Sequence, residues 1–217
     1  MTTLLETTRQ LLLISFMALP LMLICYTFFL GFGLGNSGLI ILFFGQIVLV
    51  PLVTMLFQMF TGRLGSLFSV VNHDICNLVP SSAVRGGFLT VGPSFWMAEL
   101  LFFITYLVSN ALFLYKIPPY EGADAEKIAN RQNQVVTAAI VTILLTVLFM
   151  YLRLQTGCET TMGAIVAAAT MVPLGVGWYY FAQICGIGKA DIFGIAAGVL
   201  SPSAGANATQ VCVSKQN

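Results

Sequence analysis

Five long apolar runs, separated by short polar or glycine-rich segments, dominate the pattern of hydrophobic and polar positions along this chain of 217 residues. A helix that crosses the hydrocarbon core of a bilayer needs about 20 predominantly apolar residues. Five segments meet this requirement, and we interpret them as membrane-spanning helices: 11–30, 39–60, 94–115, 135–152 and 162–185. The runs 64–71 and 192–200 are too short to cross and are expected at the interface or against the bundle. The pattern therefore predicts an all-α, polytopic integral membrane helix bundle.

Polar and small-residue segments separate or follow these runs, and water-exposed surfaces are expected there: 61–93, 117–134 and 186–217. None of them is long enough to bury a core of its own, because chains below about 40 residues rarely fold alone. We therefore predict a single membrane domain over residues 1–217. Residues 122–134 follow Pro118-Pro119 and are rich in good helix formers, so we expect a water-exposed helical extension of the fourth span.

The composition narrows the possible functions. Hydrophobic residues make up 58% of the chain and charged residues only 8%, whereas a soluble domain carries about a quarter charged residues. A soluble globular enzyme is therefore excluded. The 9 basic residues are balanced by 8 acidic ones and form no cluster, which argues against nucleic-acid binding. In a five-span topology the basic residues divide almost evenly between the two sides, so the positive-inside rule leaves the orientation open.

One predicted span carries a polar stripe. Glu99 is the ionisable residue well inside a span, and Tyr106 and Asn110 follow it seven and eleven residues later, on the same helical face. We favour interhelical hydrogen bonding as the role of this stripe, because a second carboxyl in another span is lacking; a proton or ion relay is the alternative. The plausible hydrogen-bonding partners in other spans are Gln46, Gln58, Thr137, Thr142 and Thr146.

The fifth apolar run contains small residues at helical spacing, and Gly163, Ala167 and Gly175 are the predicted helix-packing positions. Small side chains let helices approach closely in lipid, where no hydrophobic force drives them together. The sequence does not distinguish a contact within the bundle from a contact with another subunit.

The cysteines suggest one covalent link. Cys76 and Cys158 fall in loops on the same side of a five-span bundle, so a disulfide between them is topologically allowed. The N-glycosylation sequon at Asn207 falls on the opposite side, so a glycan there and this disulfide exclude each other in one topology. His73 and Asp74 lie near Cys76 but fall short of the four ligands of a structural zinc site. We predict no metal site, no cofactor and no catalytic residue.

The start of the third span carries a family resemblance. The run Pro93-Ser94-Phe95-Trp96, followed by Phe102-Phe103, Tyr106-Leu107, Asn110-Ala111 and Leu114-Tyr115, resembles segments of small multi-pass membrane proteins encoded by large DNA viruses of algae and protists. The resemblance covers about one span of five. It implies a virion membrane or minor capsid protein that holds the lipid membrane beneath an icosahedral shell, and it implies no catalytic or binding residues.

We therefore expect a structural or assembly subunit that contacts the lipid bilayer and other protein subunits of a large assembly. Its subunit contacts are expected on the small-residue face of the fifth span and on the polar segments. Two alternatives stay open. A small channel or transporter would use Glu99 and its stripe, and an accessory subunit of a respiratory or photosynthetic complex would pack beside cofactors held by its neighbours.

Overall fold

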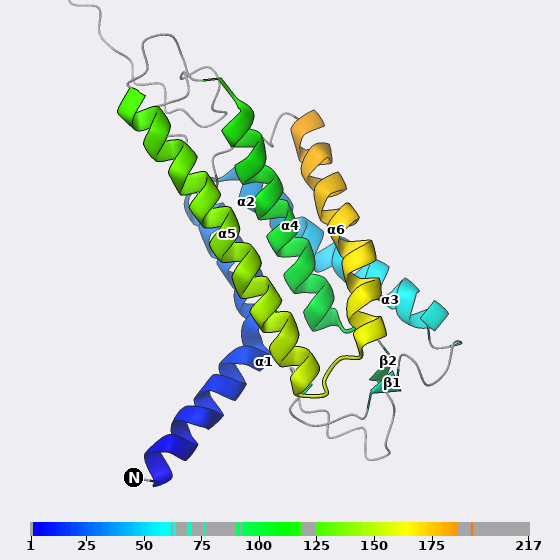
Figure 1. The fold of residues 1–217 in the computed structure, drawn as a ribbon. Helices are drawn as coiled ribbons and strands as arrows, with labels where there is room; N and C mark the ends of the chain where they lie inside the picture. Colours follow the sequence, from blue (N-terminus) through cyan, green and yellow to red (C-terminus); the bar gives the residue numbers. More distant parts are fainter. Residues whose placement is uncertain are drawn as a thin grey trace, which may run out of the picture.

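The computed structural model describes residues 2–61, 63, 69–70, 76, 90–91, 93–118, 125–185 and 192, with the side chains of residues 2–15, 69–70 and 90–91 left aside. The described part is almost entirely helical (Figure 1). The elements are α1 (Thr2–Gly33), α2 (Ser37–Phe44), the π-helical turn η1 (Gly45–Leu49), α3 (Val50–Thr61), β1 (Ser69–Val70), β2 (Thr90–Val91), α4 (Phe95–Lys116), α5 (Ala125–Gln155) and α6 (Thr161–Ile184).

The five predicted spans are confirmed. Five helical segments are long and apolar enough to cross a membrane: Phe16–Gly33, Ser37–Thr61, Phe95–Lys116, Ala125–Gln155 and Thr161–Ile184. The protein is an all-α, multi-pass integral membrane protein. The fourth helix starts ten residues before the predicted span at 135–152, as the expected polar extension continues the apolar helix without a break. Neither half contains a proline that would stop the helix.

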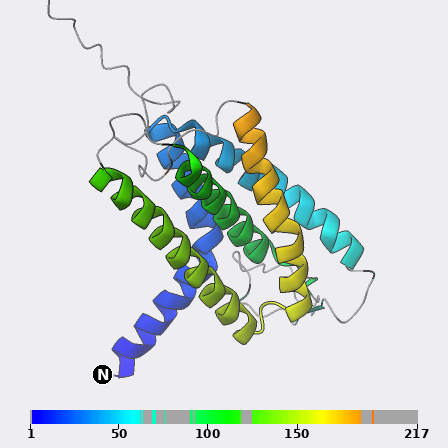
Figure 2. The same ribbon diagram turned by 45° about the horizontal axis from the view of Figure 1, so that its top comes forward.

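Successive helices run up and down between the two ends of the bundle (Figures 1 and 2). One end holds the start of α1, the β1–β2 pair and the connection from α5 to α6; the other holds the turn between α1 and α2, the end of α4 and the start of α5. The pairing of β1 with β2 is antiparallel, with Ser69 opposite Val91. These strands lie within the segment 61–93, where the sequence predicted no strand.

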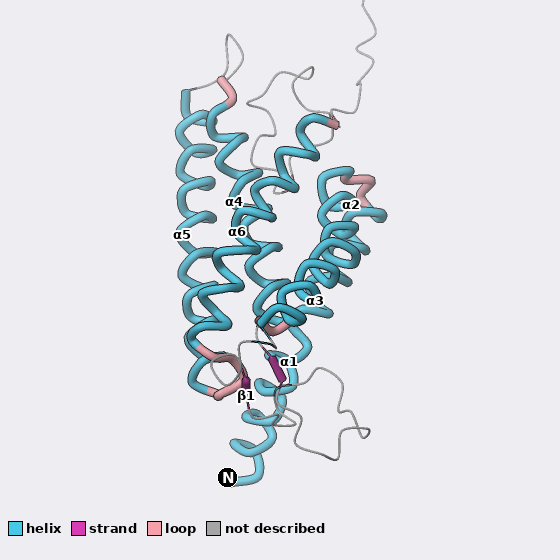
Figure 3. The backbone as a smooth tube through the Cα atoms, turned by 90° about the vertical axis from the view of Figure 1, so that its right-hand side faces the viewer, coloured by secondary structure: helices cyan, strands magenta, loops and turns pink. Residues whose placement is uncertain are grey.

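The second span is a composite helix with an irregular centre. In η1 the Val50 N–H donates to the carbonyl of Gly45, five residues back instead of four. Pro51 follows directly; a proline has no N–H, and its ring clashes with the carbonyl four residues before it. The wider π turn accommodates that clash and lets α3 continue, crossing beside α4 and α6 (Figure 3).

The first helix bends away from the others. Pro20 lies inside α1 and removes one hydrogen bond of the helical ladder. Figure 1 shows the first part of α1, in dark blue, standing apart from the bundle. Its second part, from Phe16 onward, contributes side chains to the core.

The core is built around α4. In this helix 67% of the spanning residues are buried, against 11% in α5. Helix α4 contacts α1, η1, α3, α5 and α6, so most of its side chains face protein, while Leu112 and Tyr115 near its end are exposed. The outward faces of the other helices present large apolar side chains, among them Phe29, Met59, Leu144 and Ile184, which suit a lipid environment.

Side-chain caps define where several helices begin. The Asn36 side chain accepts hydrogen bonds from the N–H groups of Gly38 and Leu39 at 3.0 and 3.2 Å, and Thr160 accepts from Gly163 at 2.9 Å. Gly35 precedes the first cap with φ of 62°, a conformation that favours glycine. These caps satisfy N–H groups that a helix start would otherwise leave unpaired.

Candidate functional site

The structure buries the whole predicted polar stripe. Glu99 and Tyr106 have no exposed surface and Asn110 is 1% exposed. The three residues lie on α4, the helix that is surrounded by protein, and none faces lipid. Although they share one face of α4, the two ends of the stripe contact different helices and form separate hydrogen-bonded clusters.

At one end of the stripe Glu99 lies with polar side chains from α1 and η1. The amide of Gln46 is the side chain that interacts with its carboxyl, and the hydroxyl of Thr27 lies 2.6 Å from Oε1 of Gln46. Gln46 and Thr27 are also completely buried. The irregular turn η1 and the absent side chain of Gly45 bring this helix close to α4, since a Cβ at Gly45 would lie 2.7 Å from Cζ of Phe102.

The other end of the stripe meets α2 and α6. The Tyr106 hydroxyl donates to the carbonyl of Gly38 at 3.0 Å, and its ring lies edge-on to Tyr179 with centroids 5.4 Å apart. Asn110 interacts with the Tyr179 hydroxyl, to which the Gln183 amide also donates. This cluster connects three helices, as expected of interhelical hydrogen bonding in lipid.

Among the partners predicted for the stripe, only Gln46 reaches it. Gln58 instead donates to the carbonyl of Pro93 at 2.9 Å, and Thr146 donates to Thr142 in its own helix at 2.7 Å. Thr137 is exposed. The prediction was wrong for these residues because hydropathy does not show which face of a helix meets which neighbour.

The predicted helix-packing residues of α6 face the interior of the bundle. Gly175 allows a close approach to α4, since a Cβ there would lie 3.0 Å from both the carbonyl oxygen of Phe102 and Cβ of Thr105. Ala167 has no exposed surface, and Gly163 makes room for the carboxyl of Glu159. The expectation that this face contacts other subunits is therefore wrong: α4 and the α5–α6 connection already occupy it.

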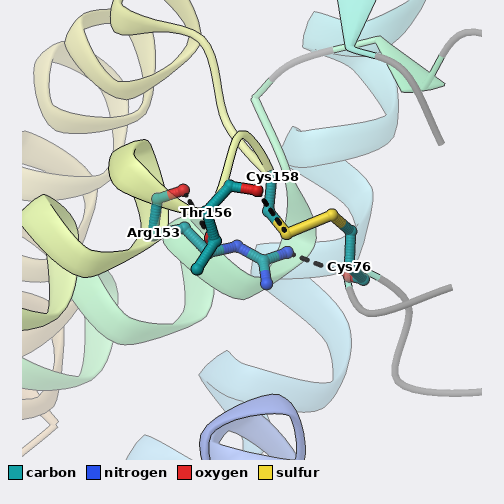
Figure 4. The surroundings of a disulfide bond; sticks show 4 residues. All are labelled: Cys76, Arg153, Thr156 and Cys158. Carbon is teal, nitrogen blue, oxygen red and sulfur yellow. Dashed lines mark hydrogen bonds between the residues drawn. A yellow bond between two sulfur atoms is a disulfide. The ribbon is translucent and has the colours of Figure 1, made fainter. Parts of the chain in front are cut away.

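A second buried cluster joins several segments at the β1–β2 end of the bundle. Cys76 and Cys158 form a disulfide (Figure 4). The Arg153 side chain donates to the carbonyl of Cys76 at 3.0 Å, and its Cζ lies 5.1 Å from the centroid of the Trp96 ring. Glu159 accepts a hydrogen bond from the N–H of Ser94 at 3.0 Å. We call this cluster the brace, formed by Cys76, Cys158, Arg153, Trp96 and Glu159.

The electrostatics of the brace follow from its burial. Arg153 and Glu159 are 2% and 5% exposed. Burial raises the pKa of the Glu159 carboxyl, while its hydrogen bonds to Ser94 and the positive charge of Arg153 oppose this rise. The two opposite charges thus partly compensate each other at a site with little water, which lets both remain inside the fold.

Sequence reasoning missed most of the brace. Arg153 ends the fourth apolar run and Glu159 follows six residues later. The positive-inside rule counts such an arginine as a residue at the membrane surface. A basic residue at the end of a span and an acid in the next short connection are the signal that could have indicated a buried pair.

The described residues contain no group of three or more His, Cys, Asp or Glu side chains that could hold a metal ion. The predicted candidates His73, Asp74 and Asn207 lie outside the described residues. The two polar clusters can hold helices together through interhelical hydrogen bonds. Comparisons with protein-family models, with curated proteins and with solved structures give no match for this chain.

Proposed function

We propose that this protein is a structural or assembly subunit of a larger membrane-bound complex. The observation that supports this role is the brace, which covalently and electrostatically ties Cys76 to the end of α5 and to the α5–α6 connection, and that connection to the start of α4. Together with the side-chain packing around α4, it favours a rigid body that presents fixed surfaces at both ends. Rigidity suits a protein that positions neighbours.

The proposed complex is the internal membrane of a virion, where the protein tethers lipid to the capsid shell. This part of the proposal depends on the resemblance of the segment 93–115. Many residues of that segment, including Trp96, Phe102 and Leu114, are buried in the core. The segment would therefore serve to shape the bundle, and the polar ends of the molecule would meet the shell.

The disulfide also supports an orientation. Disulfides persist in oxidising compartments and are rare where glutathione keeps thiols reduced. The end with Cys76 and Cys158 is therefore proposed to face an oxidising compartment, with the end of α4 and the start of α5 on the opposite side. Lys116 and Lys127 lie at that opposite end and are exposed, but the basic residues divide almost evenly between the two sides, so the disulfide alone supports this orientation.

The test is purification of the protein from its native membrane in mild detergent after brief crosslinking. Capsid or other structural subunits in the crosslinked fraction would support the proposal. Subunits of a respiratory or photosynthetic complex would support the accessory role instead, and an isolated small homo-oligomer would contradict both.

A channel or transporter is the second candidate, and one observation favours it. Both carboxyl oxygens of Glu99 are buried without a hydrogen bond, which is costly inside a membrane and typical of functional sites. Reconstitution into vesicles tests this candidate. A pH-dependent ion flux that disappears in Glu99→Gln would replace the structural role with transport.

A further inference from the structure

Three polar side chains from three different helical elements meet in the apolar core. Thr27 comes from α1, Gln46 from η1 and Glu99 from α4, and none has exposed surface. Polar groups in such a place are stable only when each finds a hydrogen-bonding partner. The hydrogen bonds available to these three side chains therefore indicate which protons they carry.

The Thr27 hydroxyl has two acceptors within reach but only one hydrogen. It lies 2.9 Å from the carbonyl oxygen of Ile24 and 2.6 Å from Oε1 of Gln46. If it donates to Gln46, the amide nitrogen of Gln46 and both oxygens of Glu99 are left without hydrogen bonds. Three buried polar atoms are then unsatisfied at one place.

The alternative orientation of the Gln46 amide, with a proton on Glu99, reduces this deficit from three atoms to one carboxyl oxygen. The oxygen and nitrogen of an amide side chain are nearly identical in shape, and their hydrogen bonds decide which one points where. When the amide is reversed, its nitrogen donates to the Thr27 oxygen and the Thr27 hydrogen goes to the carbonyl of Ile24. The amide oxygen then turns to Glu99, where only a donor can satisfy it.

We propose that Glu99, Gln46 and Thr27 form a proton-binding site, in which Glu99 holds a proton on one carboxyl oxygen and donates it to the side-chain oxygen of Gln46. The chain of hydrogen bonds runs from Glu99 through Gln46 and Thr27 to the backbone of α1. It is complete only when the proton is present. The ligand is therefore a proton, and its loss leaves a carboxylate facing the amide oxygen.

The surroundings of the site favour the neutral acid. Gln46 lies against Glu99, and in the reversed orientation it presents an acceptor that only the neutral acid can satisfy. Among the titratable groups on the neighbouring helices, Arg153 of α5 is directed to Cys76 and Glu159, and Tyr179 of α6 to Tyr106, Asn110 and Gln183. Within the described residues no cation is thus available to compensate a carboxylate at this position.

The packing of η1 makes the site sensitive to that proton. A Cβ at Gly45 would lie 2.6 Å from the Trp178 ring nitrogen and 2.7 Å from Phe102, so the helix carrying Gln46 is held against α4 and α6 without spare room. A carboxylate next to the amide oxygen would repel it. Loss of the proton should therefore loosen η1 from α4.

Infrared spectroscopy of the purified protein in detergent tests the site directly, because a protonated carboxylic acid absorbs at a higher frequency than a carboxylate. At pH 7 we expect an acid band that is absent in Glu99→Gln. In Gln46→Leu the acid loses its acceptor, so the band should shift to higher frequency. Glu159→Gln, which removes the other carboxyl that is buried among the described residues, should leave the Glu99 contribution in place.

A matched pair of threonine variants tests the relay of hydrogen bonds. Thr27→Val should shift the Glu99 band because the Gln46 amide loses its partner, whereas Thr146→Val should not, since Thr146 is buried but bonds only within its own helix. The proposal is overturned if Glu99 shows only a carboxylate band at pH 7. A carboxylate band that depends on added sodium would also overturn it, in favour of a cation site, as would an acid band unchanged in Gln46→Leu.

Discussion

Replacing Arg153 by methionine should destabilise the protein by about 2 kcal/mol, because it removes the group that connects the brace. The guanidinium donates to the carbonyl of Cys76 at 3.0 Å, and a hydrogen bond from a charged donor is worth about 1.5–3 kcal/mol. Its stacking over Trp96 adds about 0.5–2 kcal/mol. Part of this sum is offset, because methionine keeps the apolar stem and avoids the burial of a charge.

The assay is equilibrium unfolding of the detergent-solubilised protein by titration with a denaturing surfactant, followed by circular dichroism. Arg63→Met is the matched control, because Arg63 is an exposed arginine of the segment that follows α3. It should change the unfolding free energy by less than about 0.5 kcal/mol.

The disulfide supplies a second comparison. Since Arg153 binds the backbone of Cys76, its contribution depends on the position in which the bond to Cys158 holds that carbonyl. In a background with both cysteines replaced by serine, Arg153→Met should therefore cost about 1 kcal/mol less than in the wild type. The reasoning is refuted if Arg153→Met is as mild as Arg63→Met, or if its effect is the same with and without the disulfide.

Three further predictions concern other parts of the molecule. Gly175→Leu should destabilise the bundle by about 1–3 kcal/mol through overpacking against α4, whereas Gly177→Leu should be tolerated in the same unfolding assay because nothing lies within 4 Å of its added Cβ. Burial raises the pKa of the Glu159 carboxyl, so the folded protein holds this proton more tightly than the unfolded chain does. The resulting contribution to the unfolding free energy is complete below the ordinary pKa of about 4.5 and is lost as the pH rises through the raised pKa. Unfolding free energies measured across this range should therefore fall in the wild type and stay flatter in Glu159→Gln. A membrane-impermeant thiol reagent should label Cys76 and Cys158 only after reduction and from one face of sealed vesicles, and labelling without reduction would show that they are not bonded to each other.

Hydropathy predicted the spans well and their arrangement poorly. Length and apolar content decide whether a segment can cross a bilayer, so all five spans followed from the sequence. All five spans are strongly apolar, however, and hydropathy cannot show that α4 is central while little of α5 is buried. That difference arises from close contacts such as those of Gly45 and Gly175.

The candidate sites, too, were only partly predictable from the sequence. The stripe on α4 followed from helical spacing, because residues seven and eleven positions apart share a face. Of its partners, Gln46 was predicted, whereas Thr27 was not, since it is one of many threonines and reaches Gln46 only because α1 and η1 lie side by side. Arg153 was missed because a charge near the end of a span is usually solvated, whereas here it is 2% exposed.

The π turn η1 also sets the rotational position of α3, which follows it in the second span. Each residue of an α-helix turns the chain by about 100°, and the π turn absorbs one residue because it takes five residues for a turn that an α-helix closes with about four. If residues 45–49 were regular α-helix instead, α3 would be rotated by about 100°. Gln58 would then point away from Pro93, to which it donates, and α3 would lose its polar attachment to the start of α4. The irregular turn thus works as a one-residue offset: deleting one residue within 45–49 should leave Gln58 facing Pro93, whereas deleting one residue of α3 ahead of Gln58 should not.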